Sequence, residues 1–137
     1  MDKYEALKKY YGYEKFREGQ EFLIDAIMDG NDAVGIMPTG AGKSVCYQLP
    51  AVLLPGVTLV ISPLISLMKD QVKALNQNGI RAAYLNSSLT EGQMRKALQN
   101  AVAGEYRLIY VAPERLETED FLSFAMQAEI AMVTIDK

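Results

Sequence analysis

The sequence predicts an α/β fold in which a mostly parallel sheet carries helices on both faces. Short apolar runs alternate with longer helical patterns through most of the 137 residues, and that alternation is typical of parallel strands joined by crossover helices. Residues 37–44, Met-Pro-Thr-Gly-Ala-Gly-Lys-Ser, stand between one such apolar run and a helical run. Strand, glycine-rich turn and helix together are the context that a phosphate-binding loop requires.

The first half of the chain predicts two helices followed by the strand that leads into this loop. The helices are expected over residues 2–10 and 19–28, and the strand over 33–37. A helix over 44–54 follows the loop, and a second strand is expected over 57–62. Pro63 suits the first turn of the next helix, which should end at Asn78 and Gly79.

The second half continues the same alternation. A short strand is expected over 81–85, and Thr90 with Gln93 predicts a capping box that opens a helix ending near residue 102. A strand over 108–111, a helix capped by Thr118 and a strand over 132–135 complete the pattern. We expect residues 1–30 to form an N-terminal helical part and residues 33–137 to form the α/β core.

The glycine-rich loop predicts a nucleotide-phosphate site. Its glycines let backbone N–H groups point at phosphate oxygens, Lys43 would reach the β- and γ-phosphates, and the Ser44 hydroxyl would bind Mg²⁺. The strict pattern has glycine where this chain has Met37. The alternative is a surface turn that happens to contain a lysine. The residues predicted to bind the nucleotide here are Thr39, Gly40, Ala41, Gly42, Lys43 and Ser44.

The amino-acid composition excludes several classes of function. A net charge of -3 argues against a strongly basic nucleic-acid coat, so any DNA contact must be local. Histidine is absent, which removes the commonest general base. Cys46 is the single cysteine, excludes an intrachain disulfide and is expected to be a buried structural thiol. Since no apolar run is long enough to span a membrane and no signal core precedes it, we expect a cytoplasmic protein.

Five stretches of the sequence carry a resemblance to one protein family. They are residues 12–20 (Gly-Tyr-Glu-Lys-Phe-Arg-Glu-Gly-Gln), the loop at 37–44, and residues 62–72, 85–88 and 112–116. In order and spacing they resemble the N-terminal motor domain of RecQ-family DNA helicases. The loop of that family also begins with methionine, as this chain does at Met37, whereas Glu18 stands where the family usually has proline.

The resemblance implies a RecA-like P-loop domain that couples ATP hydrolysis, with Mg²⁺, to 3′-to-5′ movement along single-stranded DNA. It implies that Tyr13 and Arg17 sandwich the adenine and that Gln20 reads its edge, roles that suit an aromatic ring, a guanidinium plane and an amide. Tyr13 could instead be a core aromatic residue, and Arg17 a solvated charge at a helix entry.

The resemblance also implies three segments that touch single-stranded DNA, at 62–69, 86–88 and 112–115. Such contacts go mainly to phosphates and carry no sequence information. Two alternatives stay open: Ser62 could simply cap a helix, and the side chain of Arg115 could pair with Glu117 or Glu119. The residues predicted to contact DNA are Ser62, Pro63, Lys69, Asn86, Ser87 and Arg115.

The last two residues align with the start of the family's acidic motif. Asp136 would help to hold Mg²⁺ and, with Lys43, is a predicted catalytic residue, but Lys137 stands where the family has the glutamate that activates water. We therefore expect the sequence to be truncated after the acidic-motif strand and to bind nucleotide without turnover. The family's sheet inserts a further strand beside this one, so we also expect unpaired strand edges and self-association.

Two other functions are compatible with the phosphate-binding loop. A small P-loop kinase would transfer phosphate to a nucleoside monophosphate, but it needs an arginine-rich lid and has no use for residues 62–72 or 112–116. A binding or interaction module without enzyme activity would show no specific ATP affinity. Measuring ATP binding and phosphate transfer separates the three.

Overall fold

The computed structural model describes residues 1–30 and 43–135. The chain divides into two compact units, Met1–Leu54 and Pro55–Lys137. The predicted strand over 33–37, loop residues Thr39, Gly40, Ala41 and Gly42, and Asp136 lie outside the described residues. The division between 30 and 33 proposed from the sequence also falls on that gap and stays a prediction.

The first unit contains three described helices, α1 (Lys3–Tyr11), α2 (Gln20–Met28) and α3 (Val45–Leu53). Helix α1 is capped by Asp2, whose side chain accepts the Glu5 N–H at 2.8 Å. The three helices share one apolar cluster, formed by Ala6, Leu7, Ile24, Val45 and Leu49. Burying each large side chain of this cluster contributes roughly 1.5–3 kcal/mol, so packing rather than helix propensity holds these nine-residue helices together.

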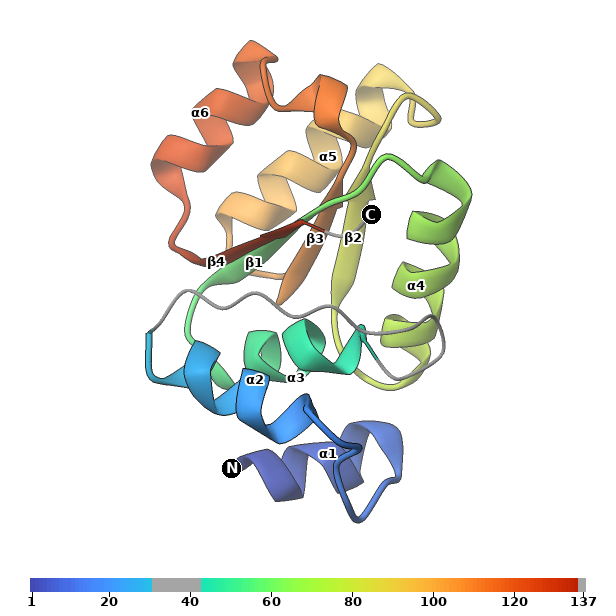
Figure 1. The fold of residues 1–137 in the computed structure, drawn as a ribbon. Coiled ribbons are helices and arrows are strands. Elements are labelled where there is room, and N and C mark those ends of the chain that lie inside the picture. The colour runs from blue at the N-terminus through green and yellow to red at the C-terminus, as the bar shows by residue number, and fades with distance from the viewer. Residues whose placement is uncertain (31–42, 136–137) are drawn as a thin grey trace. The chain divides into compact units, whose positions relative to one another are not determined.

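The second unit is a four-stranded parallel sheet in the order β2-β3-β1-β4. Its strands are β1 (Val57–Ile61), β2 (Ala82–Leu85), β3 (Leu108–Val111) and β4 (Ile130–Ile135). Helix α4 (Ile65–Gln77) covers one face, and α5 (Glu91–Val102) and α6 (Glu119–Gln127) cover the other (Figure 1). The predicted α/β fold, with a parallel sheet and helices on both faces, is confirmed.

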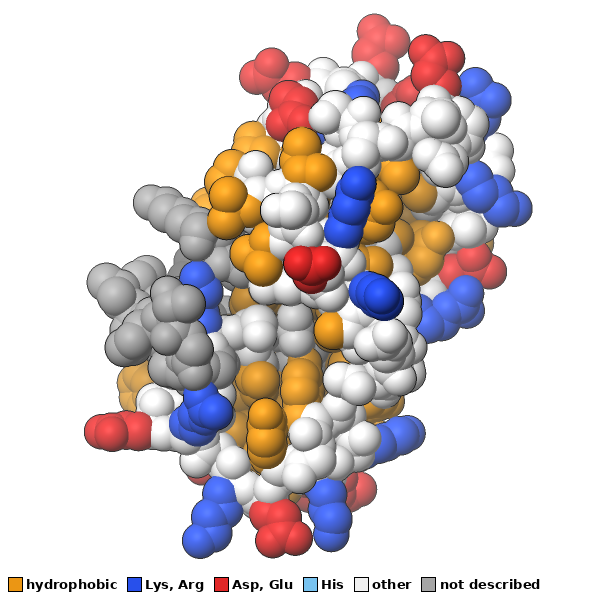
Figure 2. All heavy atoms as spheres, turned by 90° about the vertical axis from the view of Figure 1, so that its right-hand side faces the viewer, with side chains coloured by type: hydrophobic (Ala, Val, Ile, Leu, Met, Phe, Trp, Pro, Cys, Tyr) orange, Lys and Arg blue, Asp and Glu red, His pale blue; other side chains and the backbone are white. Residues whose placement is uncertain are grey.

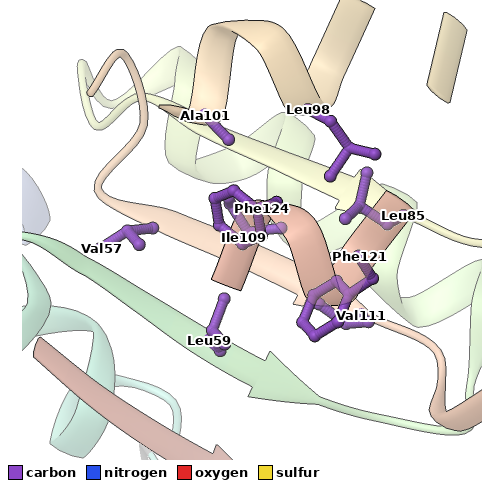
Figure 3. Packing of buried hydrophobic residues seen from close by; sticks show 9 residues of the cluster. All are labelled: Val57, Leu59, Leu85, Leu98, Ala101, Ile109, Val111, Phe121 and Phe124. Atoms are coloured by element: carbon purple, nitrogen blue, oxygen red, sulfur yellow. The ribbon is translucent and has the colours of Figure 1, made fainter. Parts of the chain in front are cut away.

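The α5–α6 face of the sheet buries the main core of this unit. Alternate strand residues point to it, and two phenylalanines of α6 pack over them with ring centroids 5.6 Å apart (Figure 3). The cluster consists of Val57, Leu59, Leu85, Leu98, Ala101, Ile109, Val111, Phe121 and Phe124. Because the side chains of a strand alternate between faces, this pattern favours the observed register of β1, β2 and β3, the strands that contribute to the cluster.

Apart from boundary shifts of one residue, the elements differ from the prediction at three places. Helix α4 begins at Ile65 instead of Pro63, since the Ser62 hydroxyl accepts the Leu64 N–H at 3.3 Å and holds residues 62–64 in a turn. Strand β4 begins at Ile130, two residues early, and a 3-10 turn that was not predicted spans Pro113–Arg115. The capping box at Thr90 and Gln93 and the Thr118 cap are both confirmed.

Among the described helices, none combines the length and apolar character needed to cross a bilayer.

Candidate nucleotide and DNA-contacting site

Lys43 and Ser44 stand at the start of a buried helix. The carbonyls of these two residues accept the first helical hydrogen bonds of α3, from Cys46 at 3.1 Å and from Gln48 at 2.9 Å. The Ser44 side chain makes no capping hydrogen bond. Its hydroxyl therefore is not committed to the helix, which fits the role of a Mg²⁺ ligand beside a helix N-terminus.

Helix α3 is buried along almost its whole length, from Val45 to Ala51. Cys46 is 7% exposed, as predicted for a structural thiol, and burial raises the pKa of its thiol. A raised pKa keeps the thiol protonated and unreactive near neutral pH. Burial of the helix thus holds Lys43 and Ser44 at its start in place. Its single thiol, that of Cys46, is not a reactive group.

Two of the residues predicted to bind adenine, Tyr13 and Arg17, lie on the turn between α1 and α2, and the third, Gln20, is the first residue of α2. Tyr13 is 53% exposed, and Arg17 is also exposed, as a base-stacking pair must be before a ligand arrives. Gln20 differs: it is 4% exposed, and its Oε1 accepts the Arg17 backbone N–H at 2.7 Å. The oxygen of Gln20 therefore holds the turn that carries Arg17. Any hydrogen bond from Gln20 to a base has to use the remaining positions of its amide.

The three predicted DNA segments begin where β1, β2 and β3 end, at the carboxyl end of the sheet. Ile61 pairs with Val111, and Val111 pairs with Leu85, so the residues that follow stand in one row. Two backbone hydrogen bonds extend this row beyond the strands, from Ser62 N–H to Val111 O at 3.1 Å and from Ala112 N–H to Leu85 O at 3.0 Å. The parallel topology thus brings together segments that are far apart in sequence.

Two of the predicted contact residues are buried in this row. Ser62 is 3% exposed and its hydroxyl supports the turn before α4, while Asn86 is fully buried. The Asn86 Oδ1 accepts the Ser88 N–H at 2.9 Å and the Ser88 hydroxyl at 2.5 Å, and its Nδ2 lies 3.6 Å from Met68 Sδ. Both side chains therefore make hydrogen bonds inside the protein, and their contact with DNA stays a prediction.

Apart from Arg115, the other predicted contact residues at this end of the sheet are accessible to solvent. Pro63, Lys69, Ser87 and Ser88 are exposed. On the side that carries α4, Lys and Arg side chains are interspersed with acidic and hydrophobic ones and form no continuous basic surface (Figure 2). This agrees with the inference from net charge that DNA contacts must be local.

Arg115 is half-buried and has mixed surroundings. Its carbonyl accepts the Thr118 hydroxyl at 2.8 Å, and its side chain borders a pocket of about 380 Å³ with Met94, Leu98 and Glu119. No ion pair with Glu117 or Glu119 forms among the described residues, and its Nε is buried without a hydrogen-bond partner. The expected alternative of a surface ion pair is therefore not found.

A buried polar contact of the first unit was missed by sequence reasoning. The Tyr11 hydroxyl donates to Gln48 Oε1 at 2.6 Å, and Gln48 is 5% exposed. The signal that could have found it is the presence of a glutamine in an otherwise apolar helix, because a buried amide needs a partner.

The residues that the structure describes contain no group of three or more His, Cys, Asp or Glu side chains suited to a metal. Among the described residues, Ser44 is the metal ligand predicted from the sequence.

The family of DEAD/DEAH box helicases matches residues 17–136 of the chain. A protein of Haemophilus influenzae named ATP-dependent DNA helicase RecQ is 47% identical over 96% of this chain and 21% of its own length. Its namesake from Bacillus subtilis is 46% identical over 96% of this chain and 22% of its own length. The ATP-dependent DNA helicase Q-like 5 of Arabidopsis thaliana is 43% identical over 96% of this chain and 14% of its own length.

The resemblance to RecQ-family helicases, predicted from the motifs, is confirmed by these matches. The chain spans about a fifth of the length of the first two relatives.

Proposed function

The chain belongs to the DEAD/DEAH box helicase family, and from this premise we propose that it is the nucleotide-binding part of a motor that moves 3′ to 5′ on single-stranded DNA. The observation that carries the proposal is the position of Lys43 and Ser44 at the start of the buried helix α3. A lysine and a serine hydroxyl that does not cap the helix, both at a helix N-terminus, suit a nucleoside triphosphate with its cation.

In this proposal Lys43 neutralises the β- and γ-phosphates, and Ser44 and Asp136 hold Mg²⁺. The cation, when bound, would offset charge that develops on the phosphoryl oxygens. Loop residues Thr39 to Gly42 would wrap the phosphates with backbone N–H groups. Tyr13 and Arg17 would stack on the base, and Gln20 would both hold the turn under Arg17 and offer its amide to the adenine edge.

The DNA-contacting surface in this proposal consists of the exposed residues of the strand-end row, Pro63, Lys69, Ser87 and Ser88, together with Arg115. Ser62 and Asn86 act as positioning residues, because their side chains bond the turns that present these neighbours. The buried Nε of Arg115 without a partner supports a role for its guanidinium in binding an anionic group.

Nucleotide binding is tested by titrating the chain with ATP in a calorimeter. Lys43→Ala should remove most of the affinity, because a phosphate charge loses its main counter-charge. Lys96→Ala, which removes an exposed lysine from α5, is the control and should bind like the unsubstituted chain. Unchanged ATP affinity in Lys43→Ala would exclude the assignment.

DNA binding is tested by fluorescence anisotropy with a labelled single-stranded oligonucleotide. Lys69→Ala should weaken binding equally for unrelated base sequences and flatten the salt dependence, since a phosphate contact is lost. The same Lys96→Ala control should change neither quantity. A sequence-dependent loss would argue against a phosphate contact.

We further propose that a polypeptide of these 137 residues does not turn over ATP. It holds Lys43, Ser44 and Asp136, but Lys137 stands where a glutamate would activate water. Losing one group of this kind costs orders of magnitude in rate. DNA-stimulated phosphate release from a preparation of verified mass would contradict this, and phosphate transfer to a nucleoside monophosphate would favour the kinase alternative.

Self-association through β4 is the remaining proposal. In the part of the chain that the structure describes, β4 pairs only with β1, along one edge. Val133 and Ile135 on this strand are 56% and 69% exposed. An apolar strand with an open edge is a template for pairing with a second copy.

A further inference from the structure

One side-chain hydrogen bond joins two elements that carry the nucleotide motifs. Tyr11, the last residue of α1, donates its hydroxyl hydrogen to Gln48 Oε1 in α3, at 2.6 Å. Gln48 is 5% exposed and Tyr11 is half-buried, so water competes weakly for this bond.

Each end of this bond lies next to a predicted ligand contact. Gly12 follows Tyr11, ends α1 in a left-handed conformation at φ 75° and leads directly to Tyr13. At the other end, the Gln48 N–H donates to the Ser44 carbonyl at 2.9 Å, one helical turn from the start of α3. The hydrogen bond from Tyr11 to Gln48 therefore lies on a path between Tyr13 and Ser44.

The surrounding apolar packing cannot define this geometry alone. Leu7 of α1 and Val45 and Leu49 of α3 belong to one buried cluster. Hydrophobic burial is non-directional, so such a cluster tolerates small shifts of one helix along the other. A buried hydrogen bond with a fixed donor and acceptor removes that freedom.

We propose that Tyr11 and Gln48 are positioning residues that hold the adenine-recognition turn at a set place relative to the start of the phosphate helix. This inference rests on the proposed nucleotide-binding function. The bond contributes little to binding phosphates alone or a base alone. It matters for a ligand that must satisfy both ends at once, because misplacement of either end costs part of the joint affinity.

The test compares ATP with inorganic triphosphate as ligands in calorimetry. Tyr11→Phe removes the hydroxyl and keeps the ring. It should weaken ATP binding roughly fivefold, the order expected for one neutral hydrogen bond, and leave triphosphate binding unchanged. Tyr10→Phe is the matched control, since its ring packs against the same cluster one residue earlier, and it should affect neither ligand.

A double-mutant cycle identifies the partner. Gln48→Met should weaken ATP binding to a similar extent, and the double variant should be no weaker than either single one, because both remove the same contact. Urea unfolding of every variant measures the accompanying loss of stability.

The outcomes separate the inference from its premise. Equal weakening of ATP and triphosphate, or unchanged ATP binding in Tyr11→Phe, overturns the positioning role while nucleotide binding stands. Additive losses in the double variant overturn the assigned partner. Absence of ATP binding by the unsubstituted chain overturns both the proposed function and this inference.

Discussion

Gln20 performs a structural task and a proposed recognition task with one amide. Its oxygen holds the Arg17 N–H, so Gln20→Ala removes both that bond and any bond to the base edge. We expect the preference for ATP over GTP to shrink, while affinity for inorganic triphosphate is retained. Competition binding with the two nucleotides measures this. Equal ATP and GTP affinity in the unsubstituted chain would remove the basis for the prediction.

Thr58 is a second residue whose surroundings predict a measurable effect. It lies fully buried in the central strand β1, and its hydroxyl has no hydrogen-bond partner. Thr58→Val has nearly the same shape and removes an unsatisfied polar group, so it should raise the free energy of unfolding by about 1 kcal/mol. Urea denaturation tests this, and a clear loss of stability would show that the hydroxyl has an undetected partner.

The sequence motifs predicted which residues belong to the site better than they predicted how exposed the side chains of those residues are. The motif that contains Asn86 could be identified from the amino-acid sequence. The full burial of the Asn86 side chain, however, goes with contacts to Ser88 and Met68 that no local sequence pattern encodes. The same holds for the Tyr11–Gln48 bond, whose partners are brought together only by helix packing. Short motifs identify chemistry, and tertiary packing decides which side chain of a motif faces a ligand.

At the scale of elements, local signals predicted most helices and strands. Caps at Thr90 and Thr118 and the stop at Asn78 were predicted because each depends on residues close in sequence. The early start of β4 was not predicted, because Ile130 joins the sheet by pairing with Val57 of a distant strand. Boundaries fixed by long-range pairing leave no trace in a local window.

Gly56 is the turn residue whose substitution should disturb two strands at once. It has φ 88°, and a Cβ atom there would lie 2.6 Å from the Glu129 carbonyl oxygen, which accepts the Val57 N–H. Gly56→Ala should therefore cost more than 2 kcal/mol of stability, through backbone strain and the displaced start of β4.

Gly104 provides the comparison for this prediction. It has φ 80°, but a Cβ atom there would have no neighbour within 4 Å. Gly104→Ala should cost only the strain, about 1 kcal/mol. Thermal unfolding of both variants measures the difference, and equal losses would show that the Glu129 contact relaxes without cost.

At the scale of the whole molecule, the edge of β4 that has no partner strand among the described residues leads us to expect a concentration-dependent assembly. Light scattering should detect species larger than a monomer for the unsubstituted chain. Val133→Lys places a charge on the exposed strand and should shift the population toward monomer. Met126→Lys is the control, because Met126 is 89% exposed on α6, away from the edge. A monomer at every concentration would rule out the association.

The strand order also has a consequence for how the chain acquires its structure. Strand β1 is the earliest strand of the described sheet in sequence, yet it stands between β3 and β4, which come much later. During synthesis its apolar Val-Thr-Leu-Val-Ile segment therefore emerges from the ribosome well before either partner exists. Closing such non-local parallel pairs is slow. The nascent chain would need shielding, by the ribosome or by a chaperone, until residues 108–135 arrive.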